Sequence, residues 1–322
     1  MSLLGSIDAK PSILLAERAA FATDSKHLSA FPQSLHHIQN LGANDIYSWF
    51  LASGSFASIP NGPSEAEASS PQIQAHTQPP DLKLNLIYPC TAPHVAKYSA
   101  QGVRVVTETP AIYRDHVRPY MKKKRDGGSL AWVYNIIDGR TEQEDVIFRQ
   151  HSSSSSATIT SDTPATASPP PQDEGFLLLP DLNWDRKTLT SMHLLAVVER
   201  RDIWSVRDLT RDHLPWLKHM REKVLAATTG LYPEVERDQI KLYVHYQPTY
   251  YHFHVHVVHV MAEASATMAV GKALGLEGVV ELLEKMEGAG NMGDINLTYT
   301  IGEASELWLE VFEPLKRAAL GR

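Results

Sequence analysis

The sequence is poor in cysteine, in long apolar runs and in positive charge. Cys90 is the single cysteine among 322 residues, which excludes an intrachain disulfide and favours a reducing compartment. No apolar run approaches the roughly 20 residues that a membrane-spanning helix needs, and the first residues show no signal-peptide pattern. We therefore expect a cytoplasmic protein, with the nucleus as a further compartment, and no membrane partner.

The charge and composition limit the kinds of partner. A net charge of -7 argues against a protein that coats DNA or RNA, because such a protein presents a basic face. A small anionic ligand in a local pocket is still compatible with this charge. The hydrophobic fraction of 43% is ordinary for a globular protein, and the length suffices for two domains. The basic run Lys122–Arg125 predicts an exposed connector, with a nuclear signal or phosphate steering as the alternative.

Two segments contain few large apolar residues. Residues 53–80 are rich in Ser, Pro, Ala, Glu and Gln and predict a flexible loop. Residues 151–174 contain the run Ser152–Ser156 and later three consecutive prolines. A segment of this composition buries too little apolar surface to offset its ordering entropy, so we predict a disordered insertion between two strands. A phosphorylated regulatory loop is the alternative.

Histidine, by contrast, is concentrated in one short stretch. Five of the 15 histidines lie between His245 and His259. Residues 241–260 are dense in β-branched and aromatic side chains, which predicts two short strands around Gln247-Pro248-Thr249. Alternate residues of a strand share a face. Three imidazoles are therefore expected to project together: His252, His254 and His256.

The remaining pattern mixes strands and helices. Period-2 alternation and short apolar runs predict strands over 82–88, 131–137, 146–149, 175–179 and 297–301. Helical spacing and capping residues predict helices over 29–50, 93–101, 189–199, 210–230, 269–286 and 303–319. Antiparallel strands with helices grouped on one side give an α+β class.

Clustered histidines serve three different chemistries. They can be structural rings whose nitrogens bond backbone groups in the core. They can bind zinc with an open coordination position, but no Asp or Glu lies between His245 and Val260 and no second cysteine exists to join them. The third possibility is covalent catalysis on phosphorus, because a neutral imidazole attacks a phosphoanhydride and neighbouring imidazoles stabilise the developing charge.

The segment His245–His256, which reads HYQPTYYHFHVH, resembles the histidine-triad superfamily and, more closely, the scavenger mRNA decapping enzymes. These enzymes hydrolyse the 7-methylguanosine cap that is left after mRNA decay. Two further blocks agree with the resemblance. Trp132–Ile136 followed by Glu142 is similar to the family's cap-stacking strand, and Leu179–Trp184 is similar to its Pro-Asp-Leu-Lys-Trp segment. The resemblance runs from about residue 84 to residue 286.

The resemblance implies roles for individual side chains. His254 would attack the phosphate attached to 7-methylguanosine and form a phosphohistidine that water resolves. His252 and His256 would orient this nucleophile and contact phosphate oxygens. The substrate-binding residues implied by the resemblance are Trp132, Glu142, Asp181, Asn183, His245, Thr249, Tyr250 and Lys272.

Some of these residues have a plainer interpretation, and one departs from the family. By its local pattern alone, Trp132 is a core residue, Glu142 a solvated turn carboxylate and Asp181 the cap of a turn. The family has Lys where Asn183 stands, and an amide brings no charge to a phosphate. Lys272, or one of the lysines in the basic run, would compensate.

The resemblance also implies a domain organisation and a reaction. Residues 1–103 would form an N-terminal domain that exchanges between the protomers of a homodimer, residues 104–127 a hinge, and residues 128–322 the histidine-triad catalytic domain. The substrate would be cap dinucleotide or short capped RNA fragments, hydrolysed to 7-methylguanosine monophosphate with no metal or other cofactor. The alternatives are a broader dinucleoside-polyphosphate hydrolase or nucleotidyl transferase, and a cap-binding regulator with little turnover.

Overall fold

The computed structural model describes residues 2–7, 10–15, 21–44, 46–54, 82–151, 175–182 and 184–321. Most of the predicted flexible loop (53–80) and of the predicted insertion (151–174) lies outside these residues, and so does Asn183. The chain folds as two compact units, residues 1–92 and residues 93–322. None of the described helices is long and apolar enough to cross a membrane.

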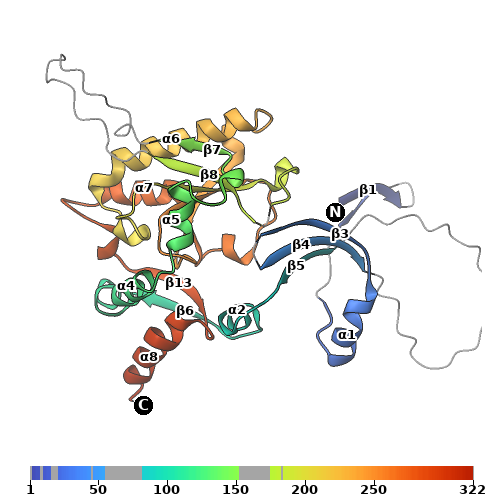
Figure 1. The fold of residues 1–322 in the computed structure, drawn as a ribbon, viewed down its shortest axis with the longest axis horizontal. Coiled ribbons are helices and arrows are strands. Elements are labelled where there is room, and N and C mark those ends of the chain that lie inside the picture. Colours follow the sequence, from blue (N-terminus) through green and yellow to red (C-terminus); the bar gives the residue numbers. More distant parts are fainter. Residues whose placement is uncertain are drawn as a thin grey trace, which may run out of the picture. The chain divides into compact units, whose positions relative to one another are not determined.

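The first unit contains two antiparallel sheets and a short helix (Figure 1). One sheet pairs β1 with β2, and the other has the strand order β3–β4–β5. Helix α1 begins after Asp24, whose carboxylate accepts a hydrogen bond from the backbone N–H of His27 at 3.2 Å. The elements are β1 (Ser2–Ile7), β2 (Lys10–Leu15), α1 (Ser25–Ala30), β3 (Leu35–Asn44), β4 (Tyr47–Gly54) and β5 (Leu82–Ile87).

The helix predicted over residues 29–50 is wrong. The helix in this region ends at Ala30, and strands β3 and β4 follow it. Strand β4 carries Trp49 and Phe50, residue types that suit a pleated sheet, and its residues pair with β5 from Tyr47 to Ala52. This pairing with a distant segment overrides the local helical spacing. The strand predicted over 82–88 is confirmed as β5.

The second unit is built on a six-stranded antiparallel sheet with the order β12–β10–β11–β9–β8–β7. A separate pair, β6 with β13, is also antiparallel. Strand β11 lies in the middle of the large sheet, so both of its edges are hydrogen-bonded. The strands are β6 (Val103–Glu108), β7 (Phe148–Gln150), β8 (Phe176–Pro180), β9 (His193–Val198), β10 (Ile240–His245), β11 (His254–His259), β12 (Ala273–Gly275) and β13 (Leu297–Gly302).

Helices α6 and α7 cover one face of this sheet. Trp216 and Leu217 of α6 join Val280 of α7 and the strand residues Leu194 and Val255 in one buried cluster. Figure 1 shows α6 beside β7 and β8. The helices are α2 (Ala92–Tyr98), α3 (Pro110–Ile112), α4 (Arg118–Asp126), α5 (Ala131–Ile137), α6 (Leu214–Leu231), α7 (Leu276–Lys285) and α8 (Glu313–Ala319), with π-helical turns at Tyr113–Val117 and Trp308–Phe312.

Two predictions in this unit are wrong because helix and strand are exchanged. Residues 131–137 form helix α5 and not a strand. Val133, Ile136 and Ile137 of this helix are buried against the sheet residues Leu177, Leu179 and Val197. The segment 189–199 is not an α-helix but contains a 3-10 turn at Leu189–Ser191 followed by strand β9. Both segments are short apolar runs, whose periodicity does not separate a buried strand from a buried helix.

The basic segment is also different from its prediction. The run Lys122–Arg125 lies on helix α4 and not on a connector, and Met121 of that helix is fully buried. Other predictions are confirmed: the α+β class, the two histidine-containing strands, the strand near 297–301, and the helix that is α6, together with shorter versions of the helices near 93–101, 269–286 and 303–319.

Candidate active site

His254 and His256 lie on the face of the sheet opposite α6 and α7. His254 and His256 alternate along β11 with residues of the buried core. Across the sheet, His256 is opposite Tyr243 of β10 and Leu195 of β9. His252 precedes β11 by two residues, so it does not continue the strand as the sequence pattern predicted. The face therefore presents two triad histidines from β11, and the third, His252, lies just before the strand begins.

The tautomer of His254 suits a nucleophile. Its Nδ1 lies 2.8 Å from the carbonyl oxygen of His252. A carbonyl oxygen only accepts, so Nδ1 carries the proton and Nε2 keeps its lone pair. Burial lowers the pKa of His254 to about 4, which keeps the imidazole neutral at pH 7. A neutral ring with a free Nε2 lone pair can attack phosphorus.

His252 acts on His254 through the backbone. Its own Nε2 donates to the carbonyl oxygen of Val198 at 2.7 Å, which fixes its ring against β9. Burial lowers its pKa to about 4. The rings of Tyr134 and His252 meet edge to face with a centroid distance of 5.7 Å. These contacts hold in place the carbonyl that orients His254, whereas direct contact of His252 with phosphate stays a prediction.

His256 is held by three aromatic neighbours. Its ring stacks on Tyr243 with a centroid distance of 4.9 Å and an interplanar angle of 4°. The ring of His245 lies 4.0 Å away, and Nδ1 lies 2.9 Å from Nε2 of His193. Burial, followed by the nearby histidines, lowers the pKa of His256 well below its usual value. His256 is therefore a neutral ring in a fixed position.

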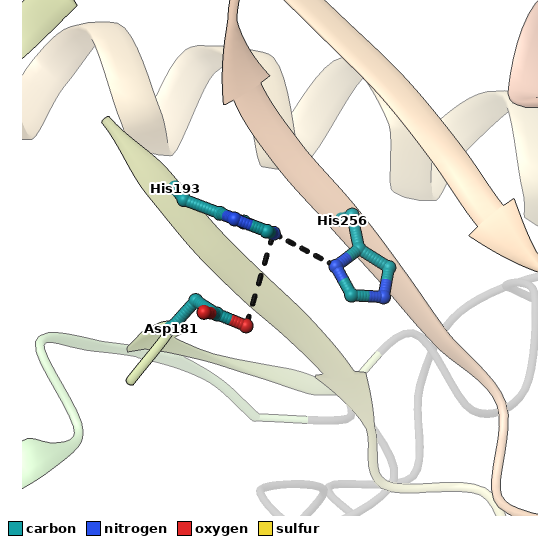
Figure 2. Close-up of side chains that lie close together, drawn as sticks. All are labelled: Asp181, His193 and His256. Carbon is teal, nitrogen blue, oxygen red and sulfur yellow. Dashed lines mark hydrogen bonds and ion pairs between the residues drawn. The ribbon is translucent and has the colours of Figure 1, made fainter. Parts of the chain in front are cut away.

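Sequence reasoning missed His193. It was placed in a predicted helix, but it begins β9 and is 8% exposed. Its Nε2 lies 3.8 Å from the carboxylate of Asp181 (Figure 2). The backbone N–H of Asp181 donates to the His193 carbonyl at 2.9 Å. The continuous apolar run that follows His193 is typical of a strand buried on both faces. That interpretation would have placed His193 beside the triad.

The phosphate-binding residues that the resemblance implied lie in the β10–β11 loop or next to it. His245 ends β10, and its Nε2 donates to the carbonyl of Thr267 at 2.9 Å. Burial, with the positive charge of Lys272, lowers the pKa of His245 to about 4. Lys272 donates to the carbonyl of Gln247 in this loop. Thr249 lies on the same loop with an exposed side chain.

The predicted cap platform is connected to the nucleophile by aromatic contacts. Trp132 lies on helix α5, not on a strand, and is 47% exposed. Its ring meets Tyr250 edge-on at a centroid distance of 5.0 Å, and Tyr250 in turn stacks on His254 at 4.3 Å. Glu142 lies in the turn after α5 with a left-handed φ of 53°. Asn183 lies outside the described residues, so its predicted contact is untested.

Asp181, His193 and His256 also have a spacing that could hold a metal ion, because their ligand atoms all lie within 4.8 Å of one another. The donor set of two imidazoles and a carboxylate fits zinc. His254 and His252 do not belong to this group. An ion held by these three residues would thus contact one triad histidine and not the candidate nucleophile.

Comparison with known proteins identifies the family of this chain. Residues 1–101 match the family described as Scavenger mRNA decapping enzyme (DcpS) N-terminal, and residues 131–271 match Scavenger mRNA decapping enzyme C-term binding. An m7GpppX diphosphatase of Schizosaccharomyces pombe is 32% identical over 315 residues, which are 98% of this chain and 89% of the relative. This chain belongs to the scavenger mRNA decapping enzyme family.

Animal members of the family are similar over most of their length. The m7GpppX diphosphatase of Ascaris suum is 36% identical over 282 residues, 88% of this chain and 79% of the relative. That of Homo sapiens is 30% identical over 286 residues, 87% of this chain and 69% of the relative. The matched range 131–271 includes every predicted site residue of this decapping-family chain except Lys272.

Proposed function

We propose that this chain hydrolyses the triphosphate bridge of m7GpppX, as cap dinucleotide or short capped RNA, and releases 7-methylguanosine monophosphate. The observation that carries the proposal is the state of His254: a neutral ring whose Nδ1 proton is held by the His252 carbonyl, leaving the Nε2 lone pair for attack. The relatives named m7GpppX diphosphatase supply the substrate class.

The reaction takes two displacements. His254 Nε2 attacks the phosphorus attached to 7-methylguanosine, and the bond from that phosphorus to the bridging oxygen of the leaving group breaks. The electron pair leaves with the nucleoside diphosphate end of the substrate. Water then attacks the phosphohistidine, loses a proton, and restores the neutral imidazole as 7-methylguanosine monophosphate leaves. Neighbouring hydrogen-bond donors stabilise the charge that develops on the phosphoryl oxygens.

Incubation of the purified chain with methylated cap dinucleotide tests the proposal. We expect 7-methylguanosine monophosphate and nucleoside diphosphate in equal amounts, analysed by chromatography. Equal rates with unmethylated dinucleoside polyphosphates would favour the broader hydrolase. Tight cap binding without products would identify a cap-binding regulator.

Selectivity for the methylated cap is expected to depend on Trp132 and Glu142. Methylation at N7 places positive charge on guanine, which strengthens stacking on an indole by about 0.5 to 2 kcal/mol and makes the Watson–Crick edge a better donor to a carboxylate. Trp132→Ala and Glu142→Ala should each weaken binding of the methylated cap by about 2- to 30-fold and affect the unmethylated cap less.

Dissociation constants for both ligands, measured with both variants, check this selectivity. Glu144→Ala is the matched control, because this carboxylate lies two residues from Glu142 and is exposed. It should change neither constant. If both ligands weaken equally in the Trp132 and Glu142 variants, these residues are structural and the methyl group is recognised elsewhere.

Turnover is expected to survive exhaustive chelation. The proposed chemistry uses the lone pair of an imidazole where a metallohydrolase uses a Lewis acid. The group with metal-like spacing leaves out His254. Product formation after dialysis against EDTA should match the untreated enzyme. Loss of activity with EDTA and recovery with zinc would favour the metal interpretation.

The proposal extends to assembly and location. A homodimer is expected for this family, and sedimentation of the purified chain at several concentrations would measure its mass. The proposed compartments are the cytoplasm and the nucleus, where capped fragments from mRNA decay would be available. Imaging of the tagged chain in its own cells tests this.

A further inference from the structure

The two nitrogens of His256 have different surroundings. Nδ1 lies 2.9 Å from Nε2 of His193. Nε2 is buried and has no hydrogen-bond partner among the described residues. A neutral imidazole carries one proton, and the hydrogen bond made by one nitrogen decides whether the other is a donor or an acceptor. The direction of the bond between His193 and His256 therefore decides what His256 Nε2 offers to a substrate.

Asp181 decides this direction. Its carboxylate oxygen lies 3.8 Å from Nε2 of His193, on the nitrogen that also faces His256 (Figure 2). A negative charge at this distance favours a proton on that nitrogen and disfavours a lone pair. His193 Nε2 therefore carries the proton and donates it to Nδ1 of His256. The single proton of the neutral His256 ring must then be on Nε2.

This buried Nε2 proton lacks a partner in the protein. Buried polar groups without a hydrogen bond are rare and unfavourable, and they recur at functional sites. The centroid of the His256 ring lies 5.3 Å from that of the His254 ring. An oxygen of a phosphate bound at His254 is therefore close enough to accept a hydrogen bond from His256. A phosphoryl oxygen only accepts hydrogen bonds, so it is the partner that an N–H donor requires.

We propose that His193 is a positioning residue for cap hydrolysis. With Asp181 it fixes His256 in the tautomer that directs the Nε2 proton to an oxygen of the substrate's triphosphate bridge. This inference rests on the proposed function and deepens it. A donor to an oxygen that gains charge acts more strongly in the transition state than in the bound substrate. Loss of the tautomer should therefore lower kcat and leave KM nearly unchanged.

Nitrogen NMR of the protein enriched with 15N-histidine reads the tautomer directly. In the wild-type protein at pH 7, His256 should show a protonated Nε2 and an unprotonated Nδ1, with the signals assigned from a His256→Gln variant. His193→Phe, which removes the donor, and Asp181→Asn, which removes the charge, should each shift His256 toward a proton on Nδ1. His193→Gln should keep the wild-type pattern, because its amide N–H reaches a similar position.

Steady-state kinetics with methylated cap dinucleotide provide the second readout. His193→Phe should lower kcat by about 10- to 100-fold with KM within about threefold of the wild type, and His193→Gln should recover most of the loss. A wild-type His256 with its proton on Nδ1, or a kcat of His193→Phe within twofold of the wild type, would overturn the proposal. An inactive wild-type enzyme would contradict the proposed function instead, and the NMR spectrum would still report the tautomer.

Discussion

A His254→Asn variant is expected to lose at least about 10³-fold in kcat while still binding methylated cap. The asparagine amide keeps some polarity in a position that is 5% exposed, but its nitrogen has no lone pair able to form a stable bond to phosphorus. Trp132 and Glu142, the predicted cap-binding residues, are unchanged in this variant. Product formation and a dissociation constant for the cap, measured on the same preparation, separate the two effects.

A covalent intermediate should distinguish wild type from variant as well. Rapid quenching of the wild-type enzyme with substrate labelled at the phosphate next to 7-methylguanosine should trap label on the protein in an acid-labile, alkali-stable form. The variant should trap none. His116→Asn, at an exposed histidine of the same unit, is the matched control and should behave as wild type. Retention of more than a few per cent of kcat in His254→Asn would remove this residue from the nucleophile role.

The histidine strands could be predicted from the sequence because their signal is local. Alternation of His with apolar residues around His254 fits a strand that has one face in the core, and β11 pairs with β10 across the connection formed by residues 246–253. The face on which His254 and His256 lie could be predicted for the same reason, since a shift of one residue would exchange His254 and Val255 between site and core.

The exchange of helix and strand at α5 and β9 shows where local pattern fails. Both segments are runs of about six mostly apolar residues, but one is buried as a helix and the other as a strand. Both faces of β9 are covered, because Leu194 and Ala196 belong to the buried cluster with α6 and Val197 belongs to the buried cluster with α5. Its sequence therefore shows no alternation. His193 was missed for this reason, because a histidine inside a predicted helix has no expected relation to a strand about 60 residues later in the sequence.

A buried ion pair in the second unit could not be predicted from the sequence either, because its partners lie 99 residues apart. Glu108 and Arg207 both have fully buried side chains and are joined at 2.7 Å. The Glu108 carboxylate also accepts hydrogen bonds from Tyr246 Oη at 2.5 Å, Tyr299 Oη at 2.7 Å and Gln247 Nε2 at 3.1 Å. Tyr246 and Gln247 follow His245 directly, so this network fixes the start of the loop that leads to the triad.

An Arg207→Met variant is expected to lower the free energy of unfolding by about 3–5 kcal/mol, because it leaves the Glu108 charge buried without its partner. Chemical denaturation followed by circular dichroism measures this change. The matched control is Lys122→Met, which removes an ion pair of 2.5 Å with Asp126 at side chains that are 66% and 63% exposed. Its effect should be below about 1 kcal/mol.

The double variant Glu108→Gln/Arg207→Met separates charge from packing. It removes the charge of both partners, so it should recover a large part of the stability lost in Arg207→Met alone. The network holds Tyr246 and Gln247 in place. Arg207→Met and the double variant should therefore also displace the loop and raise KM for the cap. The His252 carbonyl that orients His254 should stay in place. A loss below 1 kcal/mol in Arg207→Met would show that water or a rearranged side chain compensates Glu108, and that the ion pair does not hold the loop.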